Sequence, residues 1–359
     1  MNQLPDAAPP LTVLALNSGS SSLKFGLYRV DETHTEALSS GNHDTATVEQ
    51  QGDAMLDLVA RLAASGLPRP DAIGHRIVHG GPALRGHALI DDAVMSQLEA
   101  AAAFAPLHTP AALAVLRQAR QHFASTPQVA CLDTAFHADM PDVARTLPID
   151  RALRAEGIRR HGFHGLSCES IVRQLQPAMP ARLVIAHLGN GASITAVQNG
   201  SSIDTSMGLT PTGGMMMSTR SGDLDPGLLV YLMREKQLDA DGLDELVNRR
   251  SGLLGVSGIG GDMRQIRAAA DANADAALAI AMFCRSACKQ IAAMAAALGG
   301  IDTLVFTGGI GENDASTRDA ITRGLAWIGG FDVRVMRSQE DAQIARHAWH
   351  GCKRGADAG

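Results

Sequence analysis

Aromatic side chains are scarce in this sequence, at 3% of 359 residues. Proteins that bind single-stranded nucleic acid stack the bases on several exposed rings, so this composition argues against that class. No run of Lys and Arg forms a basic stripe, and the formal net charge is -6. We therefore expect neither nucleic acid nor an anionic membrane surface as a partner.

Signals for disulfides and for membranes are also missing. The five cysteines are odd in number and form no C-x-x-C pair, which favours reduced thiols over a disulfide framework. The first ten residues have neither a basic start nor an apolar run, so we expect no signal peptide. The longest apolar stretch, around 279–298, is interrupted by Arg285 and Lys289 and is not expected to cross a membrane. These absences predict a cytoplasmic protein.

What the sequence does contain is typical of a globular protein. Hydrophobic residues make up 45% and charged residues 19% of the chain. The length suggests about two domains. A cleft between two domains is a common place for a small ligand, and we expect the ligand there.

The same strand–turn–strand pattern begins each half of the sequence. In the first half, the β-rich run Leu11–Leu16 ends at a Gly/Ser turn, and a second strand continues to Val30. In the second half, Arg182–Leu188 is followed by a glycine turn and a strand over Ala192–Val197, and an Asn-Gly pair at 199–200 makes a hairpin turn. We therefore predict an α/β fold of two duplicated halves. The further strands expected are Ala72–Val78, Gln128–Asp133 and Thr303–Thr307, and the helices expected are Asp92–Ala103, Pro110–His122, Ser167–Leu175, Leu228–Lys236, Leu243–Arg249 and Asp271–Leu298.

Three loops rich in small residues follow predicted strands. Asn17–Lys24 offers hydroxyls, backbone amides and one positive charge to an anion, while Gly189–Gly191 and Gly308–Asn313 offer backbone amides. Each pattern is also common in ordinary turns. The first loop does not match the G-x-x-x-x-G-K-[ST] phosphate loop, and the second lacks the third glycine of the dinucleotide fingerprint. Neither a P-loop fold nor a nicotinamide site is therefore predicted.

Two arginines lie among glycine and apolar residues. Arg76 occurs in GHRIVHGG at the end of a predicted strand, and Arg220 occurs in TRSGDLDP within a loop. An arginine in such surroundings is either ion-paired or positioned to bind an anion. With His164 in GFHG, these two residues form a candidate anion-binding set.

Eleven motifs occur in order over nearly the whole chain: NSGSSSLK, GHRIVHGG, APLHTP, LDTAFH, RRHGFHG, HLGNGASI, DTSMGLTP, TRSGDLDPG, GVSGIGGDMR, GGIGEN and SQEDAQIAR. Together they resemble the acetate kinase family, within the acetate/propionate/butyrate kinase group. The resemblance implies a duplicated actin-like (ribonuclease H-like) fold, with an acyl-kinase lobe over 11–148 and 338–356 and a nucleotide-binding lobe over 149–337. It also implies reversible phosphorylation of acetate by ATP, Mg2+ or Mn2+ as cofactor, and a homodimer.

The resemblance also implies roles for individual residues. The catalytic set would be Arg76, Asp133, His164 and Arg220, with His164 and Arg220 stabilising the transition state. Arg76, Val78, Leu107, Phe163 and Pro211 would bind the acyl group, and Asn17 and Glu340 would hold the metal. The nucleotide would contact Ser20, Ser22, Lys24, His187, Gly189, Asn190, Gly191, Asp262, Met263, Arg264, Gly309, Ile310, Gly311 and Asn313. The sequence departs from the family at Thr212 and Gly213, where Leu-Glu is common, and at Cys168, where a histidine is usual.

The chemistry of a carboxylate acceptor agrees with this residue set. A carboxylic acid is already ionised at neutral pH, so it needs no general base, and we interpret His164 as a hydrogen-bond donor. Transfer to an anion does need cancellation of charge, which arginine and Mg2+ supply. Asp133 would repel the substrate, and we infer that it orients an arginine or a metal-bound water. We expect direct in-line transfer from ATP.

Three alternatives remain open from the sequence. Propionate or butyrate could replace acetate, since one methylene gives only about 1–3 kcal/mol of discrimination. A sugar kinase of the same superfamily would need a general base, and no sugar-specific motif accompanies the arginines. A non-catalytic nucleotide-binding module would be expected to lack Arg76, Asp133 or Arg220, and all three are present.

Overall fold

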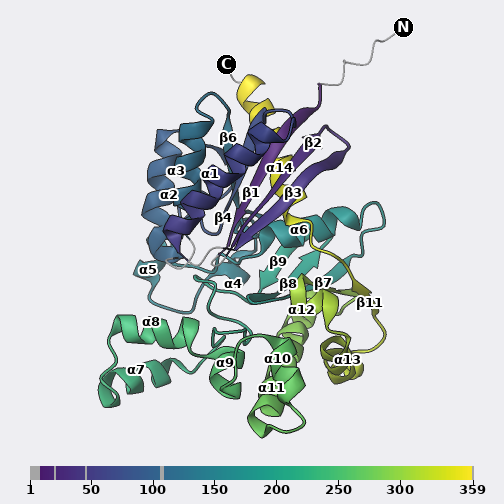
Figure 1. Cartoon of the computed structure of the whole chain (residues 1–359). Coiled ribbons are helices and arrows are strands. Elements are labelled where there is room, and N and C mark those ends of the chain that lie inside the picture. Colours follow the sequence, from purple (N-terminus) through teal and green to yellow (C-terminus); the bar gives the residue numbers. More distant parts are fainter. Residues whose placement is uncertain (1–8, 20–21, 45–46, 106–108, 358–359) are drawn as a thin grey trace. The chain divides into compact units, whose positions relative to one another are not determined.

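The computed structural model describes residues 9–357 except 20–21, 45–46 and 106–108 (Figure 1). These residues form two compact units. The first unit contains the chain up to Ala138, Gly165–Ser170 and the chain from Gln339 onward, and the second contains Asp139–His164 and Ile171–Ser338. The first division therefore falls ten residues before the predicted lobe boundary at 148. Gly165–Ser170 groups with the first unit because the Gly165 N–H donates to the Asp133 carbonyl at 2.8 Å.

A six-stranded sheet forms the centre of the first unit, in the order β3-β2-β1-β4-β6-β5. Strand β2 pairs antiparallel with both β1 and β3, whereas β1, β4 and β6 are parallel. The strands are β1 (Leu11–Ser18), β2 (Ser22–Val30), β3 (Thr35–Asp44), β4 (Ala72–Ile77), β5 (Ala88–Leu89) and β6 (Gln128–Leu132). The helices are α1 (Val48–Ala64), α2 (Asp92–Ala100), α3 (Thr109–His122) and α14 (Glu340–Asp357), with 3-10 turns at Ala101–Phe104 and Ala135–His137.

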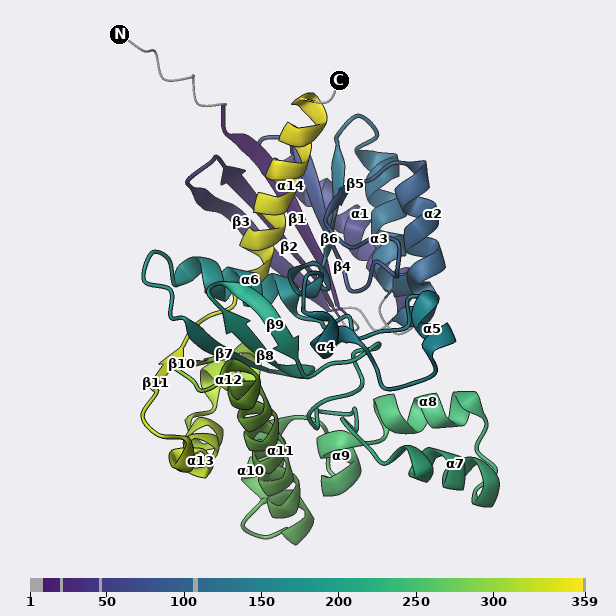
Figure 2. The same ribbon diagram turned by 180° about the vertical axis from the view of Figure 1, so that it is seen from behind.

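Alternation along β1 explains how both faces of this sheet are covered. Leu14 and Leu16 pack with residues of α1 and α3, while Val13 and Ala15 pack with residues of α14 on the opposite face. Figure 1 shows α1, α2 and α3 on one side of the sheet, and Figure 2 shows α14 on the other. Successive side chains of a strand point to opposite faces, so a strand buried on both faces is apolar throughout.

The last helix lies very close to the sheet, and a glycine makes this possible. A Cβ on Gly74 of β4 would lie 2.6 Å from the Ile344 side chain and 2.9 Å from the Ile344 carbonyl. Any larger residue at this position would push α14 outward. This approach fixes the first turn of α14, which carries Glu340 and Asp341, relative to the ends of β1 and β4.

The second unit repeats the design of the first. Its sheet has the order β11-β10-β7-β8-β9, with β7, β8 and β9 antiparallel and β7, β10 and β11 parallel. The strands are β7 (Arg182–Leu188), β8 (Ala192–Gln198), β9 (Ser201–Thr205), β10 (Thr303–Thr307) and β11 (Asp332–Val335). The helices are α4 (Asp142–Arg145), α5 (Arg151–Ala155), α7 (Pro226–Glu235), α8 (Ala240–Arg249), α9 (Gly252–Ser257), α10 (Met263–Ala269), α11 (Ala274–Leu298), α12 (Gly308–Asn313) and α13 (Ala315–Gly324), with a 3-10 turn at Ala326–Ile328; α6 (Gly165–Gln174) begins in the first unit and ends in the second.

The predicted α/β class and the duplicated hairpins are confirmed by these two sheets. The Asn-Gly turn is also present, with φ of +51° at Asn199 and +87° at Gly200. One local prediction was wrong: the segment Gly308–Asn313, expected as a loop after the strand Thr303–Thr307, is helix α12. The Glu312 carboxylate accepts from the Gly308 N–H at 3.1 Å, which satisfies a backbone donor at the start of this short helix.

Helix α11 is the one helix among the described residues that is long and apolar enough, by length and composition alone, to cross a membrane. Its buried residues, including Phe283 and Ile291, lie where the helix contacts β7, β8 and α9. The helix therefore packs within the second unit through part of its surface, and a third of its apolar window is buried.

Candidate functional site

Arg76 and Asp133 form a buried ion pair at the ends of two neighbouring strands of the first unit. Strands β4 and β6 are parallel, and their register pairs Arg76 with Cys131, so the side chain that follows β6 lies beside Arg76. Arg76 Nε and Nη2 donate to Asp133 Oδ2 at 2.9 and 2.6 Å. Burial by itself lowers the pKa of Arg76, but Asp133 and Glu340 raise it above its ordinary value. Burial raises the pKa of Asp133, against the opposing effect of Arg76.

The second carboxylate oxygen of Asp133 is available for another interaction. Asp133 is 1% exposed, and no hydrogen bond to its Oδ1 is found among the described residues, although the nearby Leu166 backbone N–H also acts to lower the pKa of this carboxyl. Buried carboxylate oxygens are almost always bonded, so an unbonded one indicates a missing ligand or water. Gly165 packs closely on the Asp133 backbone, because a Cβ on Gly165 would lie 2.2 Å from the Asp133 carbonyl oxygen.

Two further carboxylates lie near this pair, on the first turn of α14. The Asn17 side-chain amide donates to Glu340 Oε2 at 3.3 Å and to Asp341 Oδ1 at 2.8 Å, while its oxygen accepts from Arg76 Nη1 at 3.2 Å. Burial raises the pKa of Asp341, and the Asn17 hydrogen bond opposes that effect. Asn17 therefore links the ion pair to the acidic first turn of the helix.

This donor set fits a hard divalent cation. Mg2+ prefers carboxylate oxygens and retained water, and the first unit presents two such carboxylates, Glu340 and Asp341, which share the Asn17 amide. Of the two predicted metal ligands, Glu340 supplies a carboxylate, whereas the Asn17 oxygen is engaged by Arg76. Asp341 was missed from the sequence, although its place in the first turn of a helix beside Glu340 was a usable signal.

The predicted phosphate loop of the first unit is described only in part. Lys24 of β2 is paired in register with Asn17 of β1 and is exposed. The Gly19 N–H donates to the Ser22 carbonyl at 2.8 Å, which closes the turn. Ser20, predicted to contact the nucleotide, lies outside the described residues.

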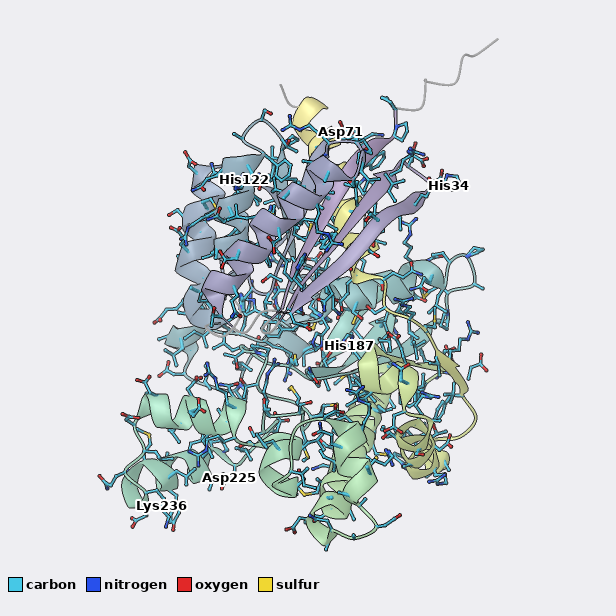
Figure 3. All side chains as sticks on the ribbon, in the orientation of Figure 1. His34, Asp71, His122, His187, Asp225 and Lys236 are labelled. Atoms are coloured by element: carbon cyan, nitrogen blue, oxygen red, sulfur yellow. The ribbon has the colours of Figure 1, made fainter. Side chains whose placement is uncertain are left out.

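In the second unit, His164 is held by a serine and by a second histidine. Its Nδ1 is 2.9 Å from the hydroxyl of Ser193, which is fully buried on β8. Its ring stacks on that of His187, with centroids 4.2 Å apart and planes at 19°. His187, labelled in Figure 3, lies on β7, the strand that contacts α12. The backbone of His164 has φ of +58°, a left-handed conformation that is uncommon outside glycine and often marks a functional position.

His164 and Arg220 face the same point above Gly191. A Cβ on Gly191 would lie 3.2 Å from His164 Nε2 and 3.4 Å from Arg220 Nη1. The same Arg220 nitrogen donates to the Pro211 carbonyl at 2.9 Å. Two nitrogen donors that converge over a glycine form a suitable cradle for a phosphoryl oxygen. Ser193, which orients His164, was missed, although it lies two residues after Gly191 on the same face of a predicted strand.

The remaining nucleotide residues lie in three groups of the second unit. Asn190 accepts from the Ser218 N–H at 3.2 Å, and a Cβ on Gly189 would lie 3.7 Å from the Gly309 nitrogen. Asn313 donates to the Gly309 carbonyl at 2.9 Å on α12, which also carries Ile310 and the buried Gly311. Asp262 pairs with Arg264 at 2.7 Å at the start of α10, beside the buried Met263.

The predicted acyl-pocket residues are distributed over both units. Val78 is buried in the first unit, and Phe163 is buried in the second, which also contains Pro211. Leu107 lies outside the described residues. The structure therefore places each described member in a buried or half-buried position, and the pocket itself stays a prediction.

Among the described residues, three metal-binding residue types have ligand atoms within 4.8 Å of one another: His87, Glu169 and His347 in the first unit. The Leu132 N–H donates to His87 Nδ1 at 3.0 Å, so the neutral ring carries its proton on Nε2. The rings of His87 and His347 have centroids 3.7 Å apart and planes tilted by 35°, and His347 Nε2 is 2.7 Å from Glu169 Oε2. To bind a metal through Nε2, His87 would have to carry its proton on Nδ1, where the Leu132 N–H already donates. This group is therefore a hydrogen-bonded packing cluster.

Known proteins similar to this chain are kinases of carboxylic acids. A family model described as the acetokinase family matches residues 48–347. The acetate kinase of Thermosynechococcus vestitus is 42% identical over 94% of this chain and 97% of that protein. Among solved structures, the acetate kinase of Porphyromonas gingivalis covers 96% of this chain and 100% of its own, with 32% identity and a TM-score of 0.83. The propionate kinase of Francisella tularensis subsp. tularensis SCHU S4 covers 95% and 99%, with 33% identity and a TM-score of 0.84.

Proposed function

The chain belongs to the acetokinase family and has the actin-like ATPase fold, and we propose that it catalyses the reversible phosphorylation of acetate by ATP to give acetyl phosphate. The structural observation that carries the proposal is the Arg76–Asp133 pair. Arg76 holds Asp133 by two hydrogen bonds to Oδ2, which assigns this carboxylate to orienting the guanidinium. A carboxylate acceptor needs no general base, because it is ionised at neutral pH, whereas a sugar hydroxyl would need one.

The proposed chemistry is direct attack of an acetate oxygen on the γ-phosphorus of ATP. The new P–O bond forms as the bond to the β-phosphate oxygen breaks, and ADP leaves with its electron pair. In the first unit, Arg76 would neutralise negative charge on the reactants. In the second unit, His164 Nε2–H and Arg220 would donate hydrogen bonds to phosphoryl oxygens, and Gly191 leaves the space that those oxygens need.

We propose that Glu340 and Asp341 hold Mg2+, directly or through water, and that Asn17 orients both carboxylates. The ion would supply charge neutralisation for the ATP phosphates. Glu340→Gln and Asp341→Asn should raise the Mg2+ concentration needed for half-maximal rate. An unchanged Mg2+ dependence in both variants would contradict this assignment.

Propionate is the second candidate substrate. It is favoured by the likeness to the Francisella propionate kinase, which is as strong as that to the Porphyromonas acetate kinase. One additional methylene changes binding by only about 1–3 kcal/mol, so both acids are expected to react.

The test is an assay with ATP and Mg2+ in which hydroxylamine traps acyl phosphate. Acetate, propionate, butyrate and glucose are compared at matched concentrations. The proposal predicts acyl hydroxamate with acetate and a lower kcat/KM with butyrate. Absence of hydroxamate with every acid would refute it.

We further propose that the protein is a cytoplasmic homodimer. Helix α7 supports the dimer, because it has no buried residue although it carries Leu228, Val230, Tyr231 and Met233, all exposed. Exposed apolar side chains gathered on one helix suit contact with a second copy of the chain. Figure 3 labels Asp225, the residue that caps this helix. Tyr231→Glu should lower the mass measured by light scattering to that of a monomer, and an unchanged mass would argue against this interface.

A further inference from the structure

We propose that Asn248 is a positioning residue, which holds Arg220 and the Pro211 carbonyl at a fixed separation through hydrogen bonds to Thr212 and Thr219. The inference rests on the proposed function, because it concerns the loop that carries Arg220. Asn248 lies in the last turn of α8 and is buried. All the contacts involved lie within the second unit.

The end of α8 is bonded to the Arg220 loop. The last four carbonyls of a helix have no partner within the helix and must be satisfied elsewhere. The Asn248 carbonyl accepts from the Thr219 hydroxyl at 2.8 Å, and the Val247 carbonyl accepts from the Ser221 N–H at 2.9 Å. Thr219 and Ser221, the residues on either side of Arg220, therefore bond the last carbonyls of α8. These bonds fix the position of the loop relative to the helix.

The Asn248 side chain reaches the second segment, which precedes the loop. The Thr212 hydroxyl donates to Asn248 Oδ1 at 2.6 Å, and Asn248 Nδ2 donates to Asp244 Oδ1 at 2.8 Å, one turn earlier on α8. Asp244 thus fixes the orientation of the amide, so that its oxygen faces Thr212. The main chain of Asn248 holds one segment, and its side chain holds the other.

The two segments meet again at Arg220 itself. Arg220 Nη1 donates to the Pro211 carbonyl at 2.9 Å, next to Thr212. If Thr212 is released, Pro211 is free to shift, and the guanidinium loses a fixed acceptor while it still faces the point above Gly191. A displacement of about 1 Å at such a group can lower a rate by about a hundredfold. The threonine at 212, unusual for this position in the acetate kinase family, thereby gains a defined role.

The variants are chosen to separate this role from general packing. Thr212→Val removes only the hydroxyl donor, Thr212→Ser keeps it, and Asn248→Ala removes the acceptor. Thr322→Val on α13 is the matched control for the Thr-to-Val change. The inference predicts that Thr212→Val lowers kcat/KM for acetate by about tenfold or more, with KM for ATP changed by less than about twofold. Thr212→Ser should retain most activity, and Asn248→Ala combined with Thr212→Val should be no worse than Asn248→Ala alone.

Hydrogen exchange of the unliganded protein gives a readout that does not need activity. Thr212→Val should speed amide exchange in 212–221, whereas Thr322→Val should leave that segment unchanged. Wild-type kcat/KM and exchange in Thr212→Val would overturn the inference, as would equal losses in Thr212→Ser and Thr212→Val. A wild-type protein that forms no acyl phosphate would refute the proposed function alone. The exchange measurement would still test whether the Thr212–Asn248 hydrogen bond holds the loop.

Discussion

Arg76 bonds a single oxygen of Asp133 through both Nε and Nη2, at 2.9 and 2.6 Å, and leaves the other oxygen of that carboxylate unbonded among the described residues. The planar guanidinium can make both bonds at once, which an ammonium group cannot. The pair therefore fixes the guanidinium of Arg76 while keeping one carboxylate oxygen for a ligand or water.

The first prediction concerns this geometry. Arg76→Lys keeps the charge but loses the double hydrogen bond, and we expect kcat to fall by about 10^3-fold, as when a charge-stabilising arginine is removed from other phosphoryl-transfer enzymes. Arg29→Lys, on an exposed part of β2, is the matched control and should keep the wild-type kcat. Comparable kcat values for the two variants at saturating substrates would contradict the role of Arg76.

The second prediction concerns the space above Gly191. Gly191→Ala places a methyl group 3.2 Å from His164 Nε2 and 3.4 Å from Arg220 Nη1, where we expect a phosphoryl oxygen. We expect kcat to fall by about a hundredfold or more, because the two donors lose access to that oxygen. Gly330→Ala adds a methyl group in open space and should leave the steady-state rate unchanged. A Gly191→Ala enzyme with wild-type kcat would exclude this placement of the phosphoryl group.

The third prediction concerns the size of the acid. Val78 is buried in the first unit, and Val78→Ala removes two carbon atoms from the wall of the inferred acyl pocket. We expect the ratio of kcat/KM for butyrate to that for acetate to rise by about tenfold, within the range that a methylene or two gives in an apolar pocket. The ratio is measured over acetate, propionate and butyrate with the same preparation. If the ratio stays constant, Val78 does not line the pocket.

The fourth prediction concerns acid stability. His75 is buried, with Nε2 2.8 Å from Gln128 Oε1, and burial lowers its pKa from 6.5 to about 4 despite that hydrogen bond. Below pH 6.5 His75 is protonated in the unfolded chain, whereas in the folded protein it stays neutral until about pH 4. The contribution of neutral His75 to the free energy of unfolding is therefore fully present above pH 6.5. It is lost as the pH falls to about 4, and the total loss is about 3 kcal/mol.

His75→Gln should reduce this pH dependence, because glutamine cannot titrate. The measurement is the urea midpoint of the variant and of the wild type at pH 7 and at pH 4.5. The exposed His122→Gln, at the end of α3, should behave as the wild type. An equal loss of stability in His75→Gln and the wild type would show that another group carries the effect.

The sequence predicted those parts of the fold whose signal is local. The hairpins β1–β2 and β7–β8 were found because short β-rich runs end at small, turn-forming residues. Strand β3 was not found, because Thr35–Asp44 is mostly polar and is a strand through its pairing with β2. Helix α1 was also missed, although Thr47 and Gln50 form a capping box, a signal that the sequence displays.

The sequence predicted which residue types belong to the candidate site. It did not predict the contacts between them. Arg76 and Asp133 are 57 residues apart, and only the parallel pairing of β4 and β6 brings them together. Asp341 and Ser193 lie beside predicted site residues in the sequence, but their contacts with Asn17 and His164 join separate elements. The Thr212–Asn248 bond spans 36 residues and likewise depends on how α8 packs.

The most direct test of the account follows phosphorus by 31P NMR, with purified protein, Mg2+, ATP and acetate. We predict that acetyl phosphate and ADP appear together, that the reverse mixture of acetyl phosphate and ADP yields ATP, and that Arg76→Lys suppresses both directions alike. ATP hydrolysis without acetyl phosphate, or transfer to glucose in place of acetate, would contradict the claim that a carboxylate is the phosphoryl acceptor.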